Sequence, residues 1–103
     1  MNNYNLILDI AMNLSRIGNW AADGYEDRKD KIITFLDNTS GYIKQLDTEM
    51  FPVDFKNTWE MFSEKYQSLS KQGLREPEDS EKWAEEMMTW GNILTHRAKL
   101  LIN

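Results

Sequence analysis

The stretch PEDSEKWAEEMMTWGNILTHRAKLL, residues 77–101, decides the predicted fold. Its apolar residues recur every three or four positions, which places them on one face of a helix. These residues are Trp83, Met87, Trp90, Leu94, Ala98 and Leu101. An amphipathic helix is stable in water mainly when that face packs against other helices. The stretch therefore predicts helical partners elsewhere in the chain.

Three further segments have the same apolar period. The first covers residues 4–22, the second residues 25–50 and the third residues 52–72, where Phe55, Trp59, Phe62, Tyr66 and Leu69 form an almost entirely aromatic row. Short connections between neighbouring helices favour antiparallel packing. We therefore predict an all-α fold, an up-down-up-down antiparallel four-helix bundle with helices at about 4–22, 25–50, 52–72 and 77–101.

Two positions leave the helix boundaries open. Gly24 is typical of a helix C-terminus, and Asp23 with Glu26 has the spacing of a capping box for a second helix. The alternative is one unbroken helix, because the apolar phase continues through Gly24. The turn-like residues 38–41 could also break the second helix, but the phase is the same on both sides of them. We expect that helix to be continuous.

Length and composition indicate one globular domain, residues 1–103. The chain has 41% hydrophobic and 28% charged residues, with only two prolines and five glycines. This balance is typical of a folded protein. Many short strands would require more turn-forming prolines and glycines than the chain has. A chain of this length buries about two thirds of its unfolded surface in a single core.

The cellular location is predicted to be cytoplasmic. The sequence contains no cysteine, which fits a reducing compartment. The N-terminal residues lack a basic stretch followed by an apolar run, so no signal peptide is expected. No segment reaches the roughly 18 unbroken apolar residues of a membrane span.

The charge pattern disfavours direct nucleic-acid binding. The formal net charge is −5, and the basic residues are scattered, whereas phosphate recognition requires a basic surface. The acidic residues are concentrated near the start of the fourth helix. This acidic patch consists of Glu76, Glu78, Asp79, Glu81, Glu85 and Glu86.

Residues that could perform chemistry are expected to face solvent. His96, the only histidine, lies far from the apolar face of its helix. The carboxylate pairs Glu60/Glu64 and Glu81/Glu85 also lie on outer faces, whereas a metal site between helices needs inward-facing ligands. We therefore expect no catalytic residue, no metal ligand and no cofactor.

Some apolar residues lie away from the predicted core faces: Leu8, Met12, Ile33, Met61 and Met88. A contiguous exposed apolar patch indicates a protein interface or a homodimer, and Leu8, Met12 and Met88 form the candidate partner surface.

The favoured function is a small non-enzymatic protein–protein interaction module, a regulator or adaptor. One alternative is a magnesium-dependent enzyme acting on nucleotide phosphates. Another is an acidic decoy of a nucleic-acid-binding surface.

Overall fold

The computed structural model describes residues 2–102 and is all-helical over that range. Helix α1 spans Asn3–Gln45, α2 spans Val53–Gly73 and α3 spans Ser80–Arg97. Two short 3₁₀ helices, η1 (Thr48–Met50) and η2 (Ala98–Leu101), precede α2 and follow α3. The prediction of an all-α fold is confirmed. No helix among the described residues has the length and apolar character needed to cross a membrane.

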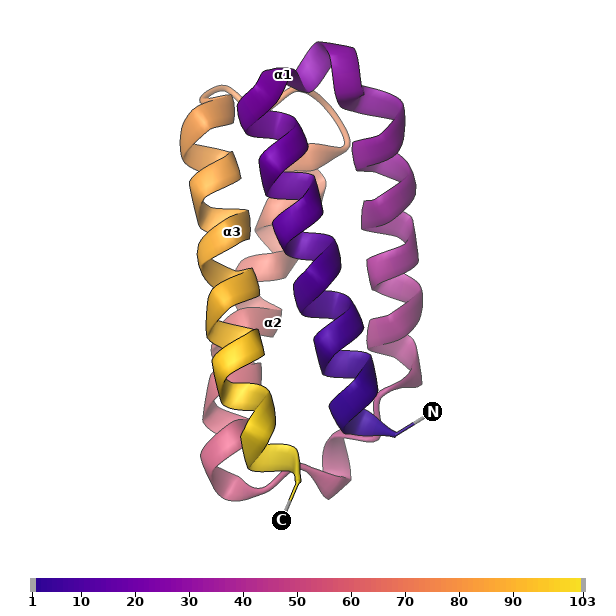
Figure 1. Ribbon diagram of the computed structural model, residues 1–103, viewed down its shortest axis with the longest axis vertical. Coiled ribbons are helices and arrows are strands. Elements are labelled where there is room, and N and C mark those ends of the chain that lie inside the picture. Colours follow the sequence, from indigo (N-terminus) through magenta and orange to yellow (C-terminus); the bar gives the residue numbers. More distant parts are fainter. Residues whose placement is uncertain (1, 103) are drawn as a thin grey trace.

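Helix α1 contains both of the first two predicted helices. Gly24 lies within it at φ 150° and ψ 102°, outside the helical region, a conformation that is available almost only to glycine. The chain reverses there, so the two arms of α1 lie side by side and run in opposite directions (Figure 1). Residues 2–102 therefore contain three α-helices, and the predicted count of four is not confirmed. Residues 38–41 remain helical, as expected.

The predicted helix ends were less accurate than the helices themselves. The helix predicted to reach residue 50 ends at Gln45, because Leu46 is already extended. Met50 belongs to η1 and is largely exposed instead of facing the core. At the other connection, Pro77 is buried in the loop before α3. Helix α3 begins three residues later, because the Asp79 carboxylate accepts a hydrogen bond from the Lys82 backbone N–H at 3.0 Å.

Small residues bring α1 and α3 close together. A Cβ added to Gly91 of α3 would lie 3.0 Å from the Ala11 carbonyl oxygen and 2.5 Å from Ser15 Oγ. A Cβ added to Gly18 of α1 would overlap Met88 and lie 2.9 Å from the Ala84 carbonyl oxygen. Real Cβ atoms do not approach other atoms this closely, so the glycines allow the two backbones to meet. Gly91 therefore lies at a close crossing of α1 and α3.

Large aromatic side chains occupy the space next to α2. All five residues of its predicted row are buried. Within this row the ring centroids of Trp59 and Phe62 lie 5.2 Å apart, and those of Phe62 and Tyr66 lie 5.3 Å apart. Phe62 also contacts Trp90 of α3 edge-on at 5.6 Å. Helix α2 is therefore separated from α3 by bulky rings, whereas α1 and α3 are in close backbone contact.

Two side chains form a polar bridge in the core between the arms of α1. Asn13 Nδ2 donates to Thr39 Oγ1 at 3.2 Å, and Thr39 Oγ1 donates to the Phe35 carbonyl at 2.7 Å. A buried polar group is costly only when it lacks a partner. No buried side-chain nitrogen or oxygen among the described residues lacks one. The bridge therefore joins the two arms of α1 with its polar side-chain atoms satisfied.

Candidate functional site

A groove runs between α2 and α3. It consists of two adjoining depressions with volumes of about 560 and 520 Å³, and Gln72 and Glu86 border both of them. We call the whole feature the α2–α3 groove. It follows from the packing described above, because the aromatic side chains hold α2 away from α3 while α3 lies close to α1.

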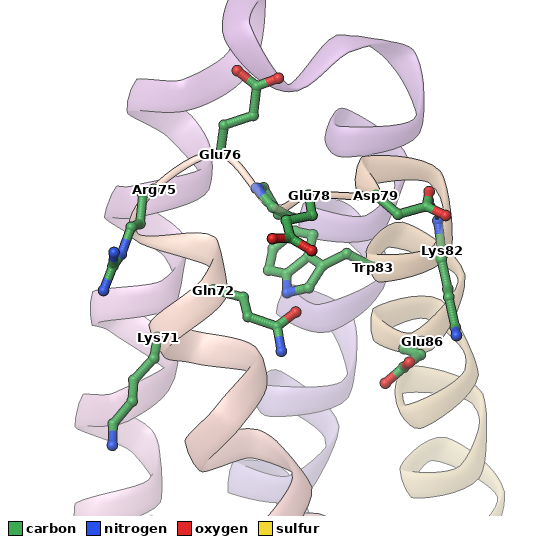
Figure 2. A pocket seen from close by; sticks show the side chains of 10 residues that line it. Lys71, Gln72, Arg75, Glu76, Glu78, Asp79, Lys82, Trp83 and Glu86 are labelled. Carbon is green, nitrogen blue, oxygen red and sulfur yellow. Dashed lines mark hydrogen bonds between the residues drawn. The ribbon is translucent and has the colours of Figure 1, made fainter.

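The upper part of the groove lies where α2, the connecting loop and α3 meet. Its lining residues are Lys71, Gln72, Arg75, Glu76, Pro77, Glu78, Asp79, Lys82, Trp83 and Glu86. In Figure 2 the Glu78 side chain lies in front of the Trp83 ring, and below the ring Gln72 and Glu86 extend toward each other from α2 and α3. Those of Lys71 and Arg75 extend away from α3, whereas that of Lys82 runs along α3 toward Glu86. The upper part therefore presents side chains of both charges, four carboxylates and three cations, together with the Gln72 amide.

The lower part of the groove is more apolar. Its lining residues are Met61, Glu64, Lys65, Ser68, Leu69, Gln72, Glu86 and Trp90. Met61 is 63% exposed, and Trp90 is only partly buried. An exposed methionine beside a tryptophan offers an adaptable apolar contact surface. This part of the groove could accept an apolar side chain.

Hydrogen bonding and packing fix the walls of the groove. Trp83 Nε1 donates to the Leu69 carbonyl oxygen at 2.9 Å, which joins the first turn of α3 to α2. Trp90 rests edge-on against the buried Phe62 ring. Trp83 itself is buried, and Gly73 lies directly against its ring. The groove is thus preformed on a rigid support, which lowers the entropic cost of binding.

The two carboxylates facing the groove have no intramolecular ion-pair partner in residues 2–102. The one ion pair found over that range joins Arg28 to Asp23 at 2.7 Å, close to the interruption of α1 at Gly24. Asp79 is engaged as the cap of α3. These two carboxylates are Glu78 and Glu86, and Lys82, four residues from each of them along the chain, lines the same part of the groove.

The loop next to the groove is attached to the second arm of α1. The Tyr25 hydroxyl donates to the Gly73 carbonyl oxygen at 2.7 Å, and burial is the main cause of the raised pKa of Tyr25. A hydrogen bond with Glu26 raises the pKa of Glu76, with burial and repulsion by Glu26 adding to the effect and Lys29 opposing it. Glu76 extends upward, away from the groove interior (Figure 2).

The acidic patch does not form one surface. Glu76, Glu78, Asp79 and Glu86 line the upper groove, whereas Glu81 and Glu85 are exposed on α3 and do not contribute to it. The structure thus brings four of the six predicted residues together around a groove. It leaves the other two on the open face of the helix.

The predicted partner surface is only partly open. Met12 is 50% exposed on α1, but Leu8 and Met88 are partly buried against the core. Met88 lies over Gly18 in the close contact between α1 and α3. Met88 therefore has a packing role in addition to any contact with a partner.

The candidate metal ligands stay on outer faces. Glu60, Glu64, Glu81 and Glu85 are exposed, as is His96. Glu64 lies at the edge of the lower groove. Within residues 2–102 no three histidine, aspartate or glutamate side chains are grouped so that they could hold a metal ion.

Sequence reasoning did not find the groove. It assigned Trp90 to the core and noted Met61 only as an apolar residue off the core face. A difference in side-chain size could have indicated it. The residues that pack against α3 are small on α1 and aromatic on α2. Comparisons of the chain with protein families, with curated proteins and with solved structures found no match.

Proposed function

We propose that this protein is a non-enzymatic interaction module that binds a segment of a partner protein in the α2–α3 groove. The observation that carries this proposal is the preformed groove, with Met61 exposed and Trp90 partly buried in its lower part. Grooves between helices with an apolar floor and a polar rim are a recurring binding site for helical peptide segments. A regulator or adaptor role agrees with such a site.

The proposal includes the finer architecture of the fold. The two arms of α1 act as separate helices, since Gly24 interrupts the helical backbone between them. With α2 and α3 they make an up-down-up-down antiparallel four-helix bundle. The cytoplasm is the proposed location, because a chain without cysteine suits a reducing compartment.

The exposed methionines allow a direct test of the binding site by photo-crosslinking. A photoreactive amino acid replaces Met61 in the groove and, in separate variants, Met12 on α1 or Met50 in η1; all three positions are at least half exposed. Each variant is expressed in the cells that naturally produce the protein. We expect position 61 to yield one defined protein adduct and position 50 to yield none.

Two matched substitutions on α2 serve as controls. Ser68→Trp places a bulky side chain in the groove without removing a core residue, and it should abolish the adduct at position 61. Gln67→Trp makes the same addition one residue away, at an exposed position outside the groove, and should leave the adduct unchanged. An adduct at position 12 but not at 61 would contradict the groove proposal and support the surface of Leu8, Met12 and Met88. An adduct with a second copy of the chain would identify a homodimer.

The two alternative functions have weaker structural support. A magnesium-dependent enzyme acting on nucleotide phosphates would use the carboxylates of Glu60, Glu64, Glu81 and Glu85, which are exposed on two helices and face outward. An acidic decoy would present a continuous negative surface, but the groove separates part of the acidic patch from Glu81 and Glu85. Specific features of the structure therefore favour the groove.

A further inference from the structure

A single residue separates the two arms of α1 from one continuous helix. Every residue of α1 except Gly24 has helical backbone angles. If Gly24 also adopted them, Asn3–Gln45 would form a straight helix of 43 residues, about 65 Å long. The change from the paired arms in Figure 1 to a straight helix therefore requires rotation about only two backbone bonds.

The buried residues of the two arms would lie on one face of that straight helix. Leu14 and Ala21 in the first arm and Ile32, Leu36 and Thr39 in the second are buried. Counted along an unbroken helix, at about 100° per residue, these positions lie within about 60° of one another. A straight α1 would therefore present both apolar segments to the same side. Its own α2 and α3, with 21 and 18 residues, are less than half as long, so burial of both segments requires a second copy of the chain.

We propose that Gly24 is a hinge at which α1 opens, and that two copies of the chain then exchange their first arms, residues 3–23. In this dimer the two straight α1 helices run antiparallel, and the first arm of each chain packs against α3 and the second arm of the other chain. The contacts that hold the first arm in the monomer are all kept. Ser15 meets Gly91 of the second copy, and Asn13 donates to Thr39 of the second copy, as they do within one chain in the monomer.

The monomer and this dimer differ mainly at residues 23–28. Only the monomer needs φ 150° at Gly24, and only there does Arg28 reach Asp23, at 2.7 Å, because side chains five positions apart on a straight helix point about 140° apart. That ion pair is solvent-exposed and contributes little. Glycine adopts φ 150° readily and association costs translational and rotational entropy, so the natural chain is mostly monomeric in dilute solution. The backbone preference of residue 24 therefore sets the balance between the two forms.

Gly24→Ala tests the hinge because it changes that preference alone. Alanine strains the closed monomer, where φ is 150°, but favours the helical conformation that the exchanged dimer needs. The dimer association constant, measured by analytical ultracentrifugation, should rise at least about tenfold over that of the natural chain. Gly41→Ala gains the same helix propensity away from the hinge and should leave association unchanged. A short flexible linker inserted after Gly24 lengthens the hinge and should keep the chain monomeric.

Isotope-edited NMR distinguishes arm exchange from any other dimer. Met88 of α3 lies against Gly18 of the first arm, where a Cβ on Gly18 would overlap it. Chains with ¹³C-labelled methionine are mixed in equal amounts with unlabelled chains, unfolded and refolded together at high concentration. An exchanged dimer should give a nuclear Overhauser effect (NOE) between Met88 of a labelled chain and Gly18 of an unlabelled one. In a dimer of closed chains this contact lies within each chain, so no NOE between chains would be seen.

Both forms keep α2 and α3 of one chain together, so this test is independent of the function proposed above. The hinge proposal is wrong if Gly24→Ala remains monomeric, or if its dimer lacks the NOE between chains. It is also wrong if Gly41→Ala dimerises as strongly, because the effect would then not depend on the hinge. Should Gly24→Ala fail to fold, the natural chain refolded at high concentration must contain a minor dimer with the same NOE, and a sample without that dimer contradicts arm exchange.

Discussion

Gly91 of α3 lies directly against Ser15 of α1, so close that a Cβ on Gly91 would lie 2.5 Å from Ser15 Oγ. Nearby, the same Cβ would lie 3.0 Å from the backbone oxygen of Ala11. A serine side chain can rotate away, but a helix backbone cannot move without shifting the helix. The close contact between α1 and α3 is therefore possible because residue 91 has no side chain.

This relationship predicts the effect of one added methyl group. Alanine has a helix propensity about 1 kcal/mol more favourable than that of glycine. We nevertheless expect Gly91→Ala to lower the free energy of unfolding by about 1–3 kcal/mol, because overpacking forces the helices apart. Chemical denaturation measures this change.

Gly41 provides the matched control for that substitution. It also lies within a helix, but a Cβ there would meet nothing within 4 Å. Gly41→Ala should therefore raise the free energy of unfolding by about 0.5–1 kcal/mol. A stabilising effect of Gly91→Ala, similar to that of Gly41→Ala, would contradict the close contact of α1 and α3.

Substitution of Gly24, where the α1 helix is interrupted, should lower stability for a different reason. A Cβ at Gly24 would have space, since its nearest neighbour is Asp27 Oδ2 at 3.6 Å, but φ is 150°. The cost of Gly24→Ala is therefore conformational, about 1–3 kcal/mol of unfolding free energy. The measurement is thermal or chemical denaturation, with Gly41→Ala again as the control. A variant as stable as the natural protein would show that the two arms do not require this backbone conformation.

Tyr66 predicts a loss of stability at high pH. Burial, partly offset by hydrogen bonds with Ser40 and Thr39, raises its pKa from 10.0 to about 12. The folded state thus holds the phenol proton more tightly than the unfolded state. The resulting stability is complete below pH 10 and is lost as the pH rises through 12, by about 3 kcal/mol in total.

Tyr66→Phe tests this pH dependence. The Leu36 carbonyl, which accepts a hydrogen bond from the Tyr66 hydroxyl at 3.4 Å, also accepts one from Ser40 Oγ, so phenylalanine leaves no orphaned acceptor. We expect a small change at pH 7 and a shallower decline between pH 10 and 12. The raised pKa of Tyr25 acts in the same direction, so a residual decline should remain. An unchanged slope would contradict the assignment to Tyr66.

Much of the fold could be predicted from the periodicity of apolar residues. The aromatic row of α2 is buried as predicted, and the glycine at position 24 marks the change of direction. The end of the helix predicted to reach Met50 could not be predicted, because the apolar phase continues beyond the residue where the backbone leaves the helix. The periodicity of apolar residues shows which face of a helix is apolar. It does not show at which residue the helix ends.

The α2–α3 groove could not be predicted from the sequence, because periodicity does not give the distance between helices. A helical wheel places Trp90 near the inner face of α3, but it does not give the distance between α3 and α2. That distance depends on which residues of the neighbouring helices meet, here glycine and alanine on one side and aromatic rings on the other. The acidic patch was recognised as a sequence run, whereas only the structure shows that Glu86 borders the groove and Glu85 does not.

The most direct measurement of the central claim is the oxidation rate of three methionines, determined by mass spectrometry after brief hydrogen peroxide treatment of the purified protein and of intact cells. Met61 in the groove, Met12 on α1 and Met50 in η1 are 63%, 50% and 71% exposed, so all three should oxidise readily in the purified protein. With a partner in the α2–α3 groove, Met61 alone should become protected in cells. Equal oxidation of Met61 in both samples, or protection of Met12 in its place, would contradict the assignment of the groove as the binding site.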